Sequence, residues 1–278
     1  MALTDLNVMY GAIQHYQAAE EEGIKPLVGT EIGFVLDIHN VQNEKMIGSL
    51  CLLAYTSQGY LNLLKLVSYA SQQGIAYRPK IDPQILKSHH EGIIAFCGGI
   101  ESWIAKMLLN GEPLAKCEEI WLMIKDIFGA ENSYLEIIAQ LHSKHPQIAK
   151  INSDILELAD KTSTPCIVSN IYSYPNPKDR KTQELAMAIK DNLKLYDPLH
   201  RVPTTDNHIM TEQEIRAICE ANGYSPDHIN TWIENTQTIA DRSTMSIEMG
   251  QALFPNYEAE PELLELYEQH KDHMILSS

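Results

Sequence analysis

Residues 49–74 read SLCLLAYTSQGYLNLLKLVSYASQQG, and this stretch decides the fold class. Its opening, SLCLLAYT, is a continuous apolar run of the kind found in strands that are buried on both faces. The remainder has Leu61, Leu64, Val67 and Ala70 at helical spacing, which predicts a helix with these side chains turned inward. A buried strand followed at once by an amphipathic helix is typical of α/β proteins.

The same alternation continues on both sides of this stretch. Further strands are predicted at residues 2–5, 24–38, 92–99, 133–138 and 165–170, and further helices at residues 8–22, 101–111, 113–129 and 145–162. Strands that alternate with helices pair in parallel through right-handed crossovers, so we expect an α/β architecture with about six strands.

From about Pro175 onward the pattern predicts helices only. A helix is expected over residues 178–190, a capping box joins Thr211 to Glu214, and another helix begins at residue 225. A turn and a charged helix follow over residues 255–273. We therefore expect a barrel core over residues 1–175 and a helical completion of the same domain over residues 176–278.

Composition and charge exclude several classes of protein. The chain has 278 residues, 44% of them hydrophobic and 21% charged, and its apolar runs are too short to cross a membrane. The sequence therefore predicts a cytoplasmic protein without a membrane partner. The net charge of −16 argues against direct DNA binding, and five scattered cysteines argue against disulfides and thiolate zinc sites.

The start of the sequence raises a question about the edge of the sheet. Residues 2–5, ALTD, read like the end of a buried strand, yet a helical pattern follows immediately. A sheet that is one strand short has an exposed edge, and exposed edges pair with other chains. We therefore expect that a preceding strand is missing, or that a partner, including a second copy of this chain, covers the open barrel edge.

The motifs resemble those of the PHP (polymerase and histidinol phosphatase) domain at the N-terminus of the bacterial replicative DNA polymerase III alpha subunit. The resemblance runs in order through ALTDLNVMYGAIQHYQAAEEEGIKPLVGTEI, LCLLAYTSQGYLNLLKLVSYA, EGIIAFCGGI, YLEI, PCIVSNIYSY, HIMTEQEI, NTQTIADR and LFPNY. It implies a distorted (β/α)7-type barrel whose first strand, carrying a His-x-His pair, would precede this sequence. The chain would thus be N-terminally truncated, and residues 176–278 would lead toward a polymerase palm that is absent.

In family members with intact sites, His, Asp and Glu side chains hold up to three metal ions that activate water against phosphoesters. The resemblance implies that one ligand survives here, Glu31 in VGTE. At the other ligand positions this sequence has Leu6, Ser49, Gly99, Ile171 and Ser173. Asp5 and Asn170 are candidates for a supporting role around the site.

One carboxylate cannot hold a catalytic metal cluster, because hydrolytic zinc needs about three protein ligands. The resemblance therefore implies a degenerate metal site without catalytic residues in a structural and interaction module for DNA replication. The parent protein would be a DNA-directed DNA polymerase, and this chain alone would be non-catalytic. The implied partners are the remainder of the alpha subunit and a proofreading exonuclease subunit. No cofactor is expected; if the chain does bind one, the resemblance implies zinc or manganese.

Two alternatives remain open at this stage. The first is an active metal-dependent phosphoesterase, either a 3'-5' exonuclease or a histidinol-phosphatase-like enzyme, that uses Glu31 with Asp37 and His39 from LDIHN. The second is a stand-alone interaction protein derived from a split polymerase gene. Two weaker signals have simpler explanations. His142 and His145 could bind a metal, but a solvent-exposed position explains them as well. The two glycines of CGGIES could admit a phosphate at a helix N-terminus, but close packing of strand and helix also explains them.

Overall fold

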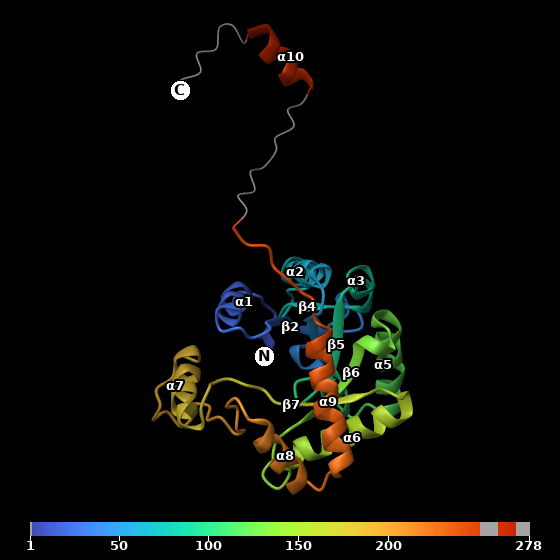
Figure 1. Cartoon of the computed structure of the whole chain (residues 1–278), viewed down its shortest axis with the longest axis vertical. Helices are drawn as coiled ribbons and strands as arrows, with labels where there is room; N and C mark the ends of the chain where they lie inside the picture. The colour runs from blue at the N-terminus through green and yellow to red at the C-terminus, as the bar shows by residue number, and fades with distance from the viewer. Residues whose placement is uncertain (1, 251–260, 271–278) are drawn as a thin grey trace. The chain divides into compact units, whose positions relative to one another are not determined.

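The computed structural model describes residues 2–250 and 261–270, and its centre is one mixed β-sheet with helices packed around it (Figure 1). The strands are β1 (Ala2–Leu6), β2 (Leu27–Phe34), β3 (Gly48–Ala54), β4 (Lys80–Ile81), β5 (Ile93–Gly98), β6 (Ser133–Ile138) and β7 (Cys166–Ser169). The strand order is β1-β2-β3-β5-β6-β7, and the short β4 pairs with β2. The predicted α/β class is confirmed, and the sheet forms an open half-barrel in which, within the described residues, β1 pairs with β2 alone and β7 with β6 alone.

The prediction of purely parallel pairing is wrong for β3. This strand runs antiparallel to both β2 and β5, whereas the other strand pairs are parallel. The cause is the connection from β2 to β3, which is a loop with a single 3-10 turn, η1 (Glu44–Met46), in place of a helix. Without a crossover helix the chain returns beside β2 in the opposite direction.

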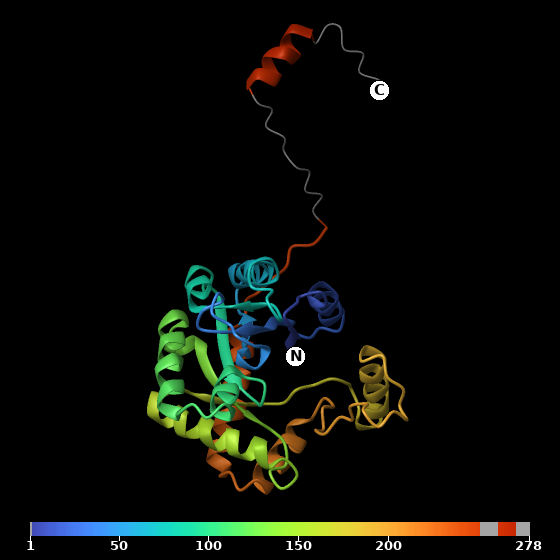
Figure 2. The same cartoon turned by 180° about the vertical axis from the view of Figure 1, so that it is seen from behind.

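The helices that the structure describes are α1 (Ala12–Glu21), α2 (Ser57–Gln72), α3 (Pro83–Ser88), α4 (Trp103–Leu109), α5 (Leu114–Phe128), α6 (Pro146–Thr162), α7 (Arg180–Lys190), α8 (Glu212–Ala221), α9 (Pro226–Arg242) and α10 (Pro261–His270), with 3-10 turns η2 (Ala130–Asn132) and η3 (Pro177–Asp179). Helices α1 to α6 and α9 pack around the sheet (Figure 2). Side-chain caps begin several of the helices, and the capping box predicted for Thr211 and Glu214 is confirmed at the start of α8.

The inward face of α2 differs from the predicted one. Of the four residues predicted to face inward, Ala70 is buried and Val67 is partly buried, but Leu61 and Leu64 are exposed. Leu63 and Leu66 are buried in place of these two leucines. The orientation is fixed by close contacts on the other helix face: the Asn62 amide donates to the carbonyl of Glu91 at 2.9 Å. The hydrogen bond of the buried Asn62 amide thus helps to decide which of the two leucine stripes faces the core.

Strand register separates the residues of the sheet into two faces. A cluster on one face, here called the inner face, contains Leu27, Leu53, Ile94, Phe96, Tyr134 and Ile167, and Ile239 of α9 completes it. On the opposite, outer face, the ring of Phe34 packs against that of Trp103 in α4, with centroids 5.8 Å apart. The inner face is therefore closed at one end by α9, and its polar residues lie toward the other end.

The segment after β7 leaves the sheet. Residues 170–179 run out to α7, which lies apart from the helices that contact the sheet in both views (Figures 1 and 2). Residues 180–202, here called the apolar arm, carry several exposed large side chains. These are Leu185, Ile189, Leu195, Tyr196, Leu199 and Val202, and Tyr196 and Leu199 are 80% and 78% exposed.

The chain divides into two compact units, Met1–Ser246 and Ile247–Ser278. Residues 176–246 thus belong to the same unit as the sheet. The finer division at residue 175 stays a prediction. In the second unit the described helix α10 falls within the predicted charged helix, whereas the LFPNY motif and His273 lie outside the described residues.

Candidate functional site

The strand register brings polar side chains from four strands to one end of the inner face. Glu31 on β2 is paired with Cys51 on β3, and Ser49 lies two residues before Cys51 on the same face. Because β3 is reversed, its first residues lie beside the carboxyl ends of the parallel strands. On β6, Glu136 is paired with Gly98 of β5, and Ser169 ends β7.

Ser49 is hydrogen-bonded to the carboxylate of Glu31. Its hydroxyl donates a short hydrogen bond to Oε1 of Glu31, and its backbone N–H donates to the carbonyl of Glu101 at 2.9 Å. Ser49 is buried and Glu31 is partly buried. One carboxylate oxygen of Glu31 therefore accepts a hydrogen bond from a protein hydroxyl. That hydroxyl belongs to Ser49, at the position where the family resemblance implies a histidine ligand.

Glu136 is a second carboxylate on this face that the sequence interpretation missed. Burial raises its pKa to about 7; the Ser169 hydroxyl, which donates to Oε1 at 3.0 Å, lowers the pKa, and the charge of Glu31 raises it. The group therefore holds a proton in a large fraction of molecules at neutral pH. The available signal was SYLEII, in which a single acid interrupts an otherwise buried strand.

Gly98 makes room for Glu136. A Cβ atom built on Gly98 would lie 2.4 Å from the Cβ of Glu136 and 2.3 Å from its carbonyl oxygen. Cys51, which lies across from Glu31, has its pKa raised well above the ordinary value by burial and then by the charges of Glu136 and Glu31. Cys51 is thus a neutral thiol at neutral pH.

Two other predicted ligand positions lie at strand ends. Leu6 ends β1 in register with Glu31, and 54% of its surface is exposed. Gly99 follows β5 with a φ of +75°, and its carbonyl accepts from the Ser102 hydroxyl at 2.8 Å. Neither residue offers a side-chain donor atom to a metal.

The remaining positions after β7 are drawn toward the 203–208 segment. Asn170 donates to the carbonyl of Asp206 at 2.9 Å and accepts from Gln140 at 3.0 Å. Ser173 donates its backbone N–H to Asn207 at 2.8 Å, and Ile171 is 49% exposed. These contacts anchor the start of the segment that leads to α7.

Asp5 lies in β1 next to Leu6, and its backbone carbonyl accepts from the Thr30 hydroxyl at 2.9 Å. Its carboxylate Oδ2 lies 3.3 Å from the position of a Cβ atom built on Gly11, at the turn into α1. The assignment of Asp5 and Asn170 as supporting groups, and of Leu6, Ser49, Gly99, Ile171 and Ser173 as lost ligands, stays a prediction.

The residues of the alternative metal sites have local partners. Oδ1 of Asp37 accepts from the backbone N–H of His39 at 2.8 Å, in the loop between β2 and β3. His142 contacts Asn152 and Tyr224, and burial lowers its pKa, whereas His145 precedes the first turn of α6. Neither pair lies with Glu31 at the strand ends.

The donor set on the inner face does not fit a catalytic zinc or manganese cluster. Within residues 2–250 and 261–270, no group of three or more His, Cys, Asp or Glu side chains is arranged to hold a metal ion. The inner face offers the carboxylates of Glu31 and Glu136, each of which accepts a hydrogen bond from a serine hydroxyl. Catalytic zinc sites use about three protein ligands, which include His.

Comparison with known proteins gives a consistent assignment. Residues 1–140 match the PHP domain family. DNA polymerase III subunit alpha of Borreliella burgdorferi is 30% identical to this chain, and the match covers 99% of this chain and 24% of the relative. The same subunit of Treponema pallidum is 27% identical, with 93% of this chain and 22% of the relative covered. The same subunit of Helicobacter pylori strain 26695 is 31% identical, with 90% of this chain and 21% of the relative covered. The chain thus spans between a fifth and a quarter of these relatives.

A solved Bifidobacterium adolescentis protein, provisionally assigned as a metal-dependent phosphoesterase, superposes with a TM-score of 0.35 at 13% identity. The match covers 79% of this chain and 85% of that one. A separate observation concerns membranes: no helix in the described part of the chain is both long and apolar enough to span one.

Proposed function

Because this chain belongs to the PHP domain family, we propose that it is the PHP portion of a bacterial DNA polymerase III alpha subunit and acts as a non-catalytic structural and interaction module. It works in the cytoplasm, in DNA replication. Its partners are the remainder of the alpha subunit and a proofreading exonuclease subunit. The net charge of −16 leaves little direct DNA binding to this part of the polymerase.

The contact between Ser49 and Glu31 carries the proposal. In a metal-loaded site the carboxylate oxygens of Glu31 would face a cation, but here one of them accepts the Ser49 hydroxyl. Glu136, the other carboxylate of this face, has a pKa near neutrality and pairs with Ser169. Both acids are therefore satisfied by protein hydroxyls, as a site that has lost its metal requires.

The surface of the module supports a role in binding other proteins. The apolar arm exposes Leu185, Ile189, Tyr196 and Leu199 beyond the sheet, and large exposed apolar patches mark interaction sites. Within the described residues β1 pairs with β2 alone, so its outer edge offers backbone groups to a partner strand, whereas on β7 the Cys166 carbonyl accepts from Asn235 of α9. A polymerase body and an exonuclease would each need such a surface.

Hydrolysis assays test the non-catalytic part of the proposal. The protein and a Glu31→Gln variant are incubated with single-stranded DNA and with a phosphate monoester, in the presence of zinc or manganese. We expect equal release from both proteins, because neither forms a metal site. Release that depends on added metal and is lost in Glu31→Gln would support the alternative of an active phosphoesterase.

Co-elution tests the interaction part. The protein is mixed with the remaining part of the alpha subunit from the same organism and separated by size. We expect a complex that a Tyr196→Ser/Leu199→Ser variant of the apolar arm weakens. The control variant Leu109→Ser/Leu122→Ser removes two exposed leucines of α4 and α5 and should leave the complex intact. No complex with the unmodified protein would contradict the proposed partnership.

A further inference from the structure

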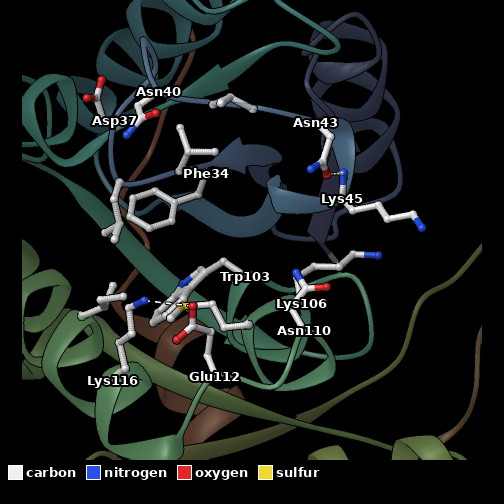
Figure 3. Close-up of a pocket in the computed structure, with 15 residues that line it drawn as sticks. Phe34, Asp37, Asn40, Asn43, Lys45, Trp103, Lys106, Asn110, Glu112 and Lys116 are labelled. Carbon is white, nitrogen blue, oxygen red and sulfur yellow. Dashed lines mark hydrogen bonds and ion pairs between the residues drawn. The ribbon is translucent and has the colours of Figure 1, made fainter.

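A cavity of about 490 Å³ lies on the outer face of the sheet, away from the polar residues of the inner face (Figure 3). Its walls come from the loop between β2 and β3, from α4 and from the start of α5. This volume is within the range of about 300 to 1,000 Å³ that is typical of small-molecule sites. The proposed function makes no use of this cavity.

The floor of the cavity is aromatic. Phe34 and Trp103 are 2% and 3% exposed, and their rings pack at an interplanar angle of 54°. Both lie between the charged groups of the rim in Figure 3. Because so little of either ring is exposed, the apolar contacts open to a ligand come mainly from Leu36, Val41 and Met107, in front of these rings.

The rim of the cavity is charged, with three lysines and the carboxylates of Asp37 and Glu112. Lys45, Lys106 and Lys116 come from three different segments, and Figure 3 shows the first two on one side of the cavity and the third on the other. Such a grouping stands out in a chain whose net charge is −16. It would concentrate anions at this position, because local charge and not net charge sets the potential of a cleft.

The carboxylate partners leave part of this charge uncompensated. Lys116 pairs with Glu112 at 3.0 Å and Lys106 with Glu101 at 2.8 Å, and the two glutamates are 40% and 53% exposed. For Lys45, the structure has no carboxylate at ion-pairing distance among the residues it describes. Exposed ion pairs are weak, so an incoming anion can compete for these lysines.

We propose that this cavity binds a small anionic ligand with an apolar body, such as a hydrophobic carboxylate, sulfonate or phosphate. Leu36, Val41 and Met107 hold the body, and Lys45 and Lys106 hold the anionic group. Lys116, on the other side of the cavity, adds positive charge near the anionic group.

A pair of fluorescent probes tests this site. One is 8-anilinonaphthalene-1-sulfonate, and the other is N-phenyl-1-naphthylamine, which has the same ring system without the sulfonate. In the variant Lys45→Gln/Lys106→Gln we expect the dissociation constant of the sulfonate probe to rise by about tenfold or more, since charge-assisted contacts are lost. The neutral probe should change by less than about twofold, because the apolar contacts remain.

Two further variants locate the probe. Lys150→Gln/Lys161→Gln removes two lysines of α6, each also paired with a carboxylate one helical turn away, and should leave both dissociation constants unchanged. Met107→Trp fills the cavity from α4 and should weaken both probes. The proposal is overturned if the rim variant leaves sulfonate binding unchanged, if the α6 variant weakens it equally, or if Met107→Trp weakens neither probe.

Discussion

At the scale of single residues, Glu136 couples stability to pH. Its pKa in the folded protein is about 7, above the ordinary value of 4.5, so between these values the folded state binds more protons than the unfolded state. The free energy of unfolding therefore falls as pH rises through this window. A shift of this size corresponds to at most about 3–4 kcal/mol.

Replacing the acid removes this penalty. We compare the free energy of unfolding of Glu136→Gln with that of the unmodified protein at two pH values. The difference in favour of Glu136→Gln should be larger at about pH 8 than at about pH 5, by about 2 kcal/mol. Urea denaturation at both pH values measures the difference. Glu234→Gln, at an exposed position of α9, serves as the control. A difference that does not change with pH would show that Glu136 ionises as an exposed acid does.

Ser49 tests whether the inner face is satisfied by protein groups. Ser49→Ala removes the donor to Glu31 and leaves a partly buried carboxylate without it, so we expect a loss of about 1–3 kcal/mol of stability. Ser68→Ala, on the exposed side of α2, should change little. Urea denaturation with and without added zinc provides the readout. Unchanged stability of Ser49→Ala would mean that Glu31 has another partner.

At the scale of elements, α2 shows what periodicity leaves undecided. Leu61 and Leu64 share one helical stripe and Leu63 and Leu66 another, and both stripes continue to Ala70. The choice depends on tertiary contacts: a Cβ atom on Gly59 would lie 1.9 Å from the carbonyl oxygen of Gly92, so this side of the helix faces the sheet. Neighbours that are distant in sequence supply this information.

Adjacent leucines of α2 make a matched pair. Leu63→Ala should cost about 2–5 kcal/mol of stability because Leu63 is fully buried. Leu64→Ala removes the same atoms from a side chain that is 38% exposed and should cost less than about 1 kcal/mol. Thermal or urea unfolding separates the two. Similar losses for both variants would contradict the orientation of the helix.

At the scale of the whole molecule, the order and type of the main elements could be predicted from the sequence because the buried strands are continuous apolar runs. The direction of β3 could not, since it depends on a loop without helical pattern, and β4 is too short to leave a pattern. Among the site residues, Glu31 and Ser49 could be placed through motifs. Their contact required the antiparallel register, and Glu136 required recognition of a lone acid in a buried strand.

The account as a whole rests on the absence of a working metal centre, and metal content tests it most directly. Tag-free protein, purified without chelator, is examined by elemental analysis for zinc, manganese and iron. Because the inner face offers too few strong donors, we expect less than about a tenth of an equivalent of each. About one equivalent or more that survives dialysis would contradict the account and show that the chain holds a metal.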